Sequence, residues 1–155
     1  MRLNFLVLCL LVVVEGSCDR KHPPVQTTSN ALIFGTFYGF CAGNCVKMYR
    51  LDNAALYKDD SVKYTTLNWA YSFQNTRLMA KDKYEIARPL LRDVPTELYA
   101  GDEKTYGAPD SHDQGGVYIA IVNGATVRRF KLDFDDTPDQ SAALIAFKHK
   151  IATVV

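Results

Sequence analysis

The sequence predicts an α+β domain: an antiparallel sheet of about five to six strands with two helices packed on one face. Three observations lead to this prediction. Short apolar and aromatic runs between turn residues, typical of strands, recur from residue 31 to residue 134. Two other segments repeat apolar residues at helical spacing. The order of strands, helix, hairpin and helix favours helices gathered on one face of a sheet.

The composition is that of an ordinary globular protein. The chain has 155 residues, 48% of them hydrophobic, and a formal net charge of +1, which suits one folded domain. Because a nearly balanced charge produces no extended positive field, we do not expect nucleic acid as a partner. No motif calls for a cofactor, and none is expected. We therefore expect residues 31–155 to form a single α+β domain.

The strands are expected where apolar and aromatic residues cluster between turn residues. The clearest alternation runs through Thr65–Phe73, where every second residue from Leu67 onward is apolar or aromatic, as in a half-buried strand. Asn123-Gly124 is the strongest hairpin signal, because both residues accept a positive φ. The expected strands are 31–37, 46–51, 54–57, 65–73, 117–122 and 126–134.

Two helices are expected, one in the middle of the chain and one near its C-terminal end. The first has Asp82 and Glu85 as a candidate capping pair and repeats apolar residues every four positions from Ile86. Pro89 removes one backbone hydrogen bond, so this helix should be kinked or divided there. The second should begin at 137–140, where a threonine cap precedes a proline. Its apolar stripe consists of Leu144, Phe147, Ile151 and Val155.

Residues 1–17 have the pattern of a signal peptide and are set aside from the fold. A short start with one positive charge, Arg2, precedes an unbroken apolar run of ten residues, Phe5–Val14. A run of this length is typical of a signal-peptide core. It is too short to span a bilayer, which takes about 20 apolar residues. We therefore expect the chain to be exported.

The next residues resemble a bacterial lipobox. Gly16 and Ser17 are small and directly precede Cys18, although Glu15 stands where an aliphatic residue is usual. We interpret Cys18 as the lipidation site, which would anchor the protein stably to a membrane. Ordinary cleavage after Gly16, which leaves a protein without lipid, is the alternative. Residues 18–30 are polar and contain two adjacent prolines, so beyond the lipidated cysteine they should form a flexible tether.

Cys41 and Cys45 are the two cysteines that remain in the domain, since Cys9 lies in the signal peptide. They sit in a glycine-punctuated loop, 39–45. Exported compartments are oxidising, so an even pair favours a disulfide. The alternatives are free thiols, a redox dithiol or half of a metal site, for which zinc would need two further ligands nearby.

Asp110, His112 and Asp113 form a candidate binding loop. Carboxylates and imidazole suit a metal ion or general acid–base chemistry. The alternative is that the Asp, Ser and Gly residues of 107–116 serve only the turns of the loop itself. No nucleophile and no spaced carboxylate partner accompany them, so no catalytic residue is assigned and no metal site is expected.

Three segments together resemble a family of small, uncharacterised bacterial lipoproteins. They read FGTFYGFC at 34–41, YEIA at 84–87 and PDSHDQGG at 109–116, and the resemblance spans most of residues 31–155. It implies a signal peptide, a lipobox cysteine, one α+β domain and no assigned activity. Members of that family tend to carry Cys at the positions of Ala108 and Ser111.

These observations predict a lipid-anchored protein of a bacterial cell envelope, on its periplasmic or surface side, whose domain is a binding or structural module. Its expected partners are the membrane, through the lipid, and a protein of the envelope. The alternative is a small envelope enzyme, or a metal or redox protein, that uses the Cys41–Cys45 and Asp110–Asp113 loops. That alternative requires the two loops to meet in one cleft, because metal ligands lie within about 2–2.6 Å of the ion.

Overall fold

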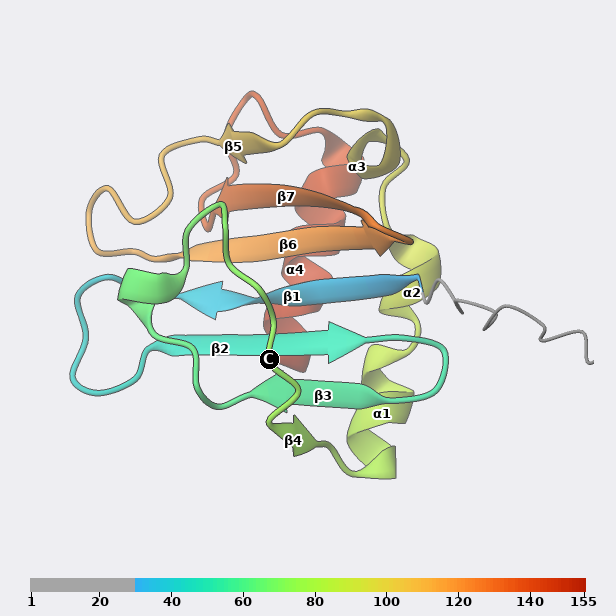
Figure 1. The fold of residues 1–155 in the computed structure, drawn as a ribbon. Coiled ribbons are helices and arrows are strands. Elements are labelled where there is room, and N and C mark those ends of the chain that lie inside the picture. Colours follow the sequence, from blue (N-terminus) through green and yellow to red (C-terminus); the bar gives the residue numbers. More distant parts are fainter. Residues whose placement is uncertain (1–29) are drawn as a thin grey trace, which may run out of the picture.

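A seven-stranded sheet forms the centre of the molecule (Figure 1). The structure is a computed structural model that describes residues 30–155, so the predicted signal peptide, the proposed lipidation site Cys18 and the tether up to residue 29 lie outside the described residues. The strand order is β4-β3-β2-β1-β6-β7-β5. The strands are β1 (Ala31–Phe37), β2 (Val46–Leu51), β3 (Leu56–Asp59), β4 (Arg77–Leu78), β5 (Lys104–Tyr106), β6 (Gly116–Asn123) and β7 (Thr126–Asp133).

The predicted α+β class is confirmed, and the sheet is larger than expected. The central strand β1 pairs antiparallel with β2 on one side and with β6 on the other, and β6 and β7 form the expected hairpin. Only the edge strand β5 pairs in parallel, with β7. The short edge strands β4 and β5 bring the count to seven, and β5 makes the sheet mixed rather than purely antiparallel.

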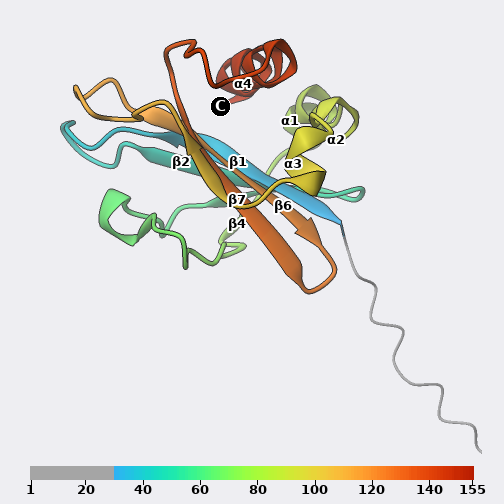
Figure 2. The same ribbon diagram turned by 90° about the horizontal axis from the view of Figure 1, so that it is seen from above.

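Helices cover one face of this sheet (Figure 2). They are α1 (Lys81–Ala87), α2 (Leu90–Asp93), α3 (Glu97–Ala100) and α4 (Ala142–Val154). Pro89 divides the first predicted helix into α1 and α2, as expected from its missing N–H. No helix within residues 30–155 has both the length and the apolar content needed to cross a bilayer.

The main core lies between these helices and the sheet. Every residue of β1 is buried, because the sheet is covered on both faces. Burying such apolar side chains is the main favourable contribution to folding. From the helices the core receives Ala87, Leu90, Val94, Leu98, Leu144, Phe147 and Ile151.

An irregular segment, residues 60–76, covers the opposite face (Figure 2). It contains a short 3-10 helix, η1 (Tyr64–Thr66). The predicted strand Thr65–Phe73 is therefore wrong. Leu67 and Tyr71 are buried in a second core against the sheet, whereas Trp69 is exposed, so the buried positions recur every four residues.

Two predicted helix starts are also wrong. Helix α4 begins at Ala142, because the Ser141 side chain accepts a hydrogen bond from the backbone N–H of Leu144 at 3.1 Å. Residues 137–140 instead form a turn that precedes it. Helix α1 begins at Lys81 after Ala80, without a side-chain cap, so Asp82 lies inside its first turn.

Candidate functional site

The loop that carries Cys41 and Cys45 connects β1 to β2 at one end of the sheet. The two cysteines lie at disulfide distance, with their Cα atoms 6.1 Å apart, within the usual range for a disulfide. The backbone N–H of Tyr38 donates to the Cys45 carbonyl at 3.1 Å and closes the base of the loop. The Asn44 side chain donates to the Val62 carbonyl at 3.2 Å, which joins the loop to the segment 60–76.

The predicted binding loop, 107–116, enters β6 at the same end of the sheet. Gly107, Asp110, Asp113 and Gly115 all have a positive φ, between 60° and 77°. Aspartate is one of the few residues with a side chain that tolerates this conformation. The backbone N–H of Asp110 donates to the Gly115 carbonyl at 2.8 Å, and the N–H of Gly115 donates to the Asp110 carboxylate at 3.0 Å. The Asp110 carboxylate therefore helps to build the loop in which it lies.

A buried charged network holds this loop against the sheet. Asp133 accepts hydrogen bonds from the backbone of Ala108 and Asp135, each at 3.0 Å, and from Gln114 at 3.4 Å. Burial alone would raise the pKa of Asp133, but these hydrogen bonds and the nearby Lys148 ammonium lower it below its ordinary value.

Lys148 is the second part of this network, and the side chain is only 1% exposed. Its ammonium donates to the carbonyls of Asp133 and Asp135 and to the Gln140 side chain, and it pairs with Asp136 at 2.9 Å. A buried lysine is stable only when its donors are satisfied in this way. The sequence feature that could have revealed this buried lysine is its position four residues after Leu144, on the buried face of α4.

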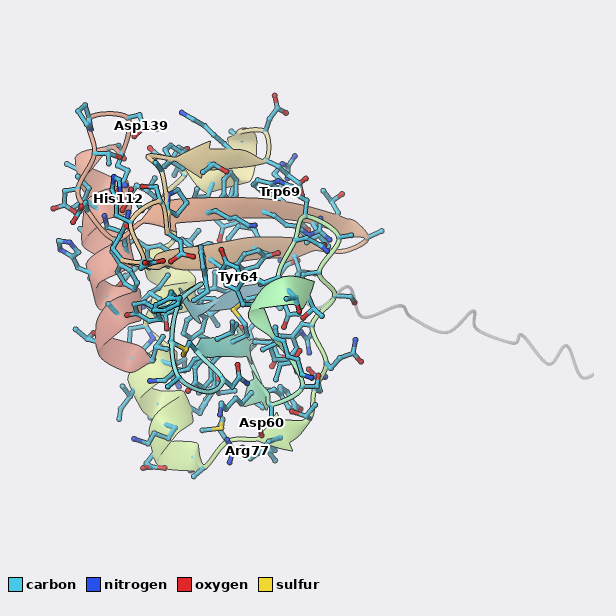
Figure 3. All side chains as sticks on the ribbon, turned by 90° about the vertical axis from the view of Figure 1, so that its left-hand side faces the viewer. Asp60, Tyr64, Trp69, Arg77, His112 and Asp139 are labelled. Atoms are coloured by element: carbon cyan, nitrogen blue, oxygen red, sulfur yellow. A yellow bond between two sulfur atoms is a disulfide. The ribbon has the colours of Figure 1, made fainter. Side chains whose placement is uncertain are left out.

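The two loops meet at Gly39. A Cβ atom at Gly39 would collide with the Asp110 carboxylate, so any larger residue would have to displace that side chain. Tyr64 of η1 lies at the same place, and its hydroxyl donates to Asp110, which raises the pKa of Tyr64 above its ordinary value. Figure 3 looks at this end of the sheet and shows Tyr64 near its centre, between Asp60 and His112.

A hollow of about 420 Å³ opens between the cysteine loop and residues 60–65, and we call it the end hollow. Its lining includes Cys41, Cys45, Lys63 and the rings of Tyr38 and Tyr64. Beside it, Phe40 lies 80% exposed on the cysteine loop. Exposed aromatic side chains around a hollow are characteristic of binding surfaces.

The predicted site residues are only partly brought together. Cys41, Cys45 and, through Tyr64, Asp110 lie at the end hollow, whereas His112 and Asp113 are exposed and do not line it. Within residues 30–155, no group of three or more His, Cys, Asp or Glu side chains is placed to hold a metal ion. The two loops therefore form one continuous surface. In the part of the chain that the structure describes, the Asp110 loop has no group of side chains placed to bind a metal ion.

Asp59 directly precedes the residues 60–65 that line the end hollow, and it was not among the predicted site residues. The carboxylate is 1% exposed and accepts hydrogen bonds from Ser61, Val62, Tyr71 and Gln74. Burial alone would raise the pKa of Asp59, but these bonds lower it below its ordinary value. The available signal was an aspartate two residues before a serine, which is typical of a turn closed by a side chain.

The fold and this site define an α+β domain with a loop-built surface at one end of its sheet. Comparison with protein-family models, curated proteins and solved structures gives no match to the chain.

Proposed function

We propose that the chain is a lipid-anchored cell-envelope protein whose domain is a binding module, and that the end hollow and its aromatic rim contact the partner. The observation that carries the proposal is the convergence of three loops from distant parts of the sequence: 38–45, 60–65 and 107–116. Binding residues concentrate on loops that a rigid scaffold positions. The resemblance to small bacterial lipoproteins agrees with this role and is part of the proposal.

The direction of β1 supports a partner on the far side from the membrane. The strand begins at Ala31, next to the proposed tether, and ends at Phe37, next to the cysteine loop (Figure 1). Seven residues of strand extend over about 20 Å. The end hollow therefore lies at the opposite end of β1 from Ala31, where the proposed tether would join the domain.

The exposed aromatic side chains favour another envelope protein as the partner. Tyr and Phe are enriched at the centre of protein interfaces, where a few large side chains contribute most of the binding energy. Phe40 is more exposed than any other large hydrophobic residue of the described chain. A loop closed between Cys41 and Cys45 loses little freedom on binding, which favours affinity.

Photocrosslinking in living bacteria tests the binding surface. We would place p-benzoylphenylalanine at Phe40 and, as a matched control, at Ile86, which is 56% exposed on α1. We expect a crosslinked protein adduct from position 40 and none from position 86. Equal adducts from both positions, or none from position 40, would contradict the proposed surface.

Metabolic labelling with a lipid precursor tests the anchor separately. The unmodified chain should incorporate the label, and the Cys18→Ala variant should not. Equal labelling of both chains would remove the anchor from the proposal and leave the binding surface to be judged by crosslinking.

A small redox protein of the envelope is the second candidate, because the cysteine pair itself lines the end hollow. In that case a substrate thiolate would attack one cysteine sulfur and release the other as a thiolate, and a second substrate thiol would complete the exchange. The result is two protein thiols and one substrate disulfide. Oxidation of one equivalent of a dithiol peptide by the disulfide form of the protein, lost in Cys41→Ser, would favour this candidate over the binding module.

A further inference from the structure

A second hollow, of about 250 Å³, lies on the sheet face opposite the helices, and we call it the arginine hollow. Arg50 of β2 and Arg129 of β7 line it, and no carboxylate side chain does. The rest of its wall consists of the polar residues Ser72 and Asn75 and of five apolar or aromatic side chains: Ile33, Tyr71, Phe73, Val122 and Val127. None of the residues that line it lines the end hollow.

The sheet register explains why two arginines share one hollow. Arg50 is opposite Ile33, Ile33 is opposite Ala120, and Ala120 is opposite Arg129. Four residues in one row across neighbouring strands point to the same face. The outer two Cα atoms are therefore about 14 Å apart, at roughly 4.8 Å per strand. The small Ala120 leaves room between two long side chains that can both reach inward.

Carboxylates outside the hollow hold both guanidinium groups. Arg129 pairs with Glu103 at 2.8 Å, and Arg50 pairs with Asp52 at 3.5 Å. Neither of these carboxylates belongs to the lining of the hollow. Such pairs orient an arginine, whose planar group carries five donors and can serve a second acceptor.

Two buried donors, one on Arg129 in the lining and one on Tyr118 behind Tyr71, have no acceptor within residues 30–155. The Tyr118 hydroxyl and the Arg129 Nε are buried without a hydrogen-bond partner, and Tyr118 as a whole is 1% exposed. Tyr118 packs edge-on against Tyr71, which lines the hollow. Burial raises the pKa of Tyr118 to about 12, although the neighbouring Arg129 lowers it, so the hydroxyl keeps its proton. Buried donors without acceptors are rare and costly.

We propose that the arginine hollow binds a small organic acid, with its carboxylate at Arg50 and Arg129 and its apolar body against Phe73 and Val127. Every charged group of the lining is a hydrogen-bond donor with positive charge, which matches a carboxylate. The apolar walls suit the aliphatic or aromatic part of an organic acid. An inorganic anion would leave these walls in contact with water.

Titration of the full chain with sodium benzoate, followed by ¹H–¹⁵N NMR, tests the site. We expect saturable shifts of amides around the hollow, including those of Val122 and Val127. Benzamide has the same shape without the charge and should cause no saturable shift. Saturable binding of benzamide with equal affinity would overturn the proposal. So would equal binding of inorganic phosphate, or no saturation by benzoate up to about 50 mM.

Three variants locate the binding. Arg129→Gln should weaken benzoate binding about tenfold or more, because it removes a charged donor. Tyr118→Phe keeps the ring and removes only the hydroxyl, so it should weaken benzoate binding several-fold and still fold. This variant decides whether the site exists if Arg129→Gln does not fold. Arg128→Gln is the control, since Arg128 pairs with Ile121 and faces the helices. Equal weakening in Arg128→Gln, or unchanged affinity in Tyr118→Phe, would overturn the proposed contacts.

Discussion

Asp59→Asn is the substitution that most directly tests how the segment 60–76 is held on the sheet. One oxygen of Asp59 accepts from the backbone of Ser61 and Val62, and the other accepts from the Tyr71 hydroxyl at 2.8 Å and the Gln74 N–H at 3.0 Å. No β-ladder joins residues 60–76 to the sheet. Side-chain hydrogen bonds, among them these four to one carboxylate, therefore stand in place of the strand pairing that the sequence suggested.

The expected cost follows from what an amide can still do at this place. Its oxygen can keep the bonds to Ser61 and Val62, but its NH₂ group then faces two donors, from Tyr71 and Gln74. The Tyr71 hydroxyl can rotate and accept, whereas the Gln74 N–H is left without an acceptor. Losing one bond to a charged group and leaving one buried donor unpaired should reduce the free energy of unfolding by about 2–4 kcal/mol.

The single tryptophan of the chain makes this measurable. Trp69 lies in the segment, with the Lys131 ammonium 5.4 Å from its ring centre. Urea unfolding of Asp59→Asn should be followed both by Trp69 fluorescence and by far-UV circular dichroism. We expect a lower urea midpoint than for the unmodified chain. The Trp69 fluorescence should change at a lower urea concentration than the circular dichroism, because the segment detaches before the sheet unfolds.

Asp60→Asn is the matched control, because Asp60 is exposed and pairs with Lys58 and Arg77 at the surface. Its effect should be clearly smaller, since exposed ion pairs contribute little. The reasoning is refuted if Asp59→Asn unfolds within about 0.5 kcal/mol of the unmodified chain, the usual range for surface substitutions.

Further predictions concern the core, the charged network and the cysteines. Lys148→Met should lower the free energy of unfolding by about 3 kcal/mol in urea titrations, because it leaves buried acceptors unpaired; an unchanged midpoint would contradict this. Asp133 has a lowered pKa in the folded state, so its contribution is complete above about pH 4 and is lost as pH falls through the folded pKa. Asp133→Asn should accordingly flatten the acid limb of a plot of stability against pH, and an identical limb would refute that. Gly35→Ala should prevent normal folding, judged by circular dichroism, because its Cβ would collide with a backbone carbonyl of β2; a native spectrum would be the contrary result. Thiol titration of the unfolded, unreduced domain, residues 31–155, should find no free thiols, and two free thiols would exclude a disulfide between Cys41 and Cys45.

Local signals predicted the regular parts of the fold well. The predicted hairpin and its two strands were confirmed within a residue or so at each end, because both depend on neighbours in the sequence. Its turn lies one residue later than predicted, at Gly124 and Ala125, since Asn123 still pairs with Thr126 and, of these residues, only Gly124 has a positive φ. The division at Pro89 was confirmed for the same reason. The start of α4 was misplaced because Ser141 caps it without the glutamate or glutamine that makes a capping box recognisable.

The candidate site was less predictable, because long-range contacts assemble it. The alternating residues of Thr65–Phe73 looked like a strand, yet Asp59 holds this segment by side-chain bonds that no local window contains. The meeting of Gly39 with Asp110 depends on β1 and β6 being neighbours in the sheet. The cysteine pair and the Asp110 loop were identified as candidates, whereas Tyr64, which links them, was not.

The place of β1 in the sheet has a consequence for how the chain acquires its structure. Ala31 pairs with Val122 and Phe37 with Gly116, so the central strand is the first to be synthesised and must wait for a neighbour from near the other end. Pairings so distant in sequence form slowly, and apolar strands that wait unpaired are prone to aggregate. The central strand therefore keeps one edge unpaired until β6 has been synthesised, whatever the order in which the other strands form.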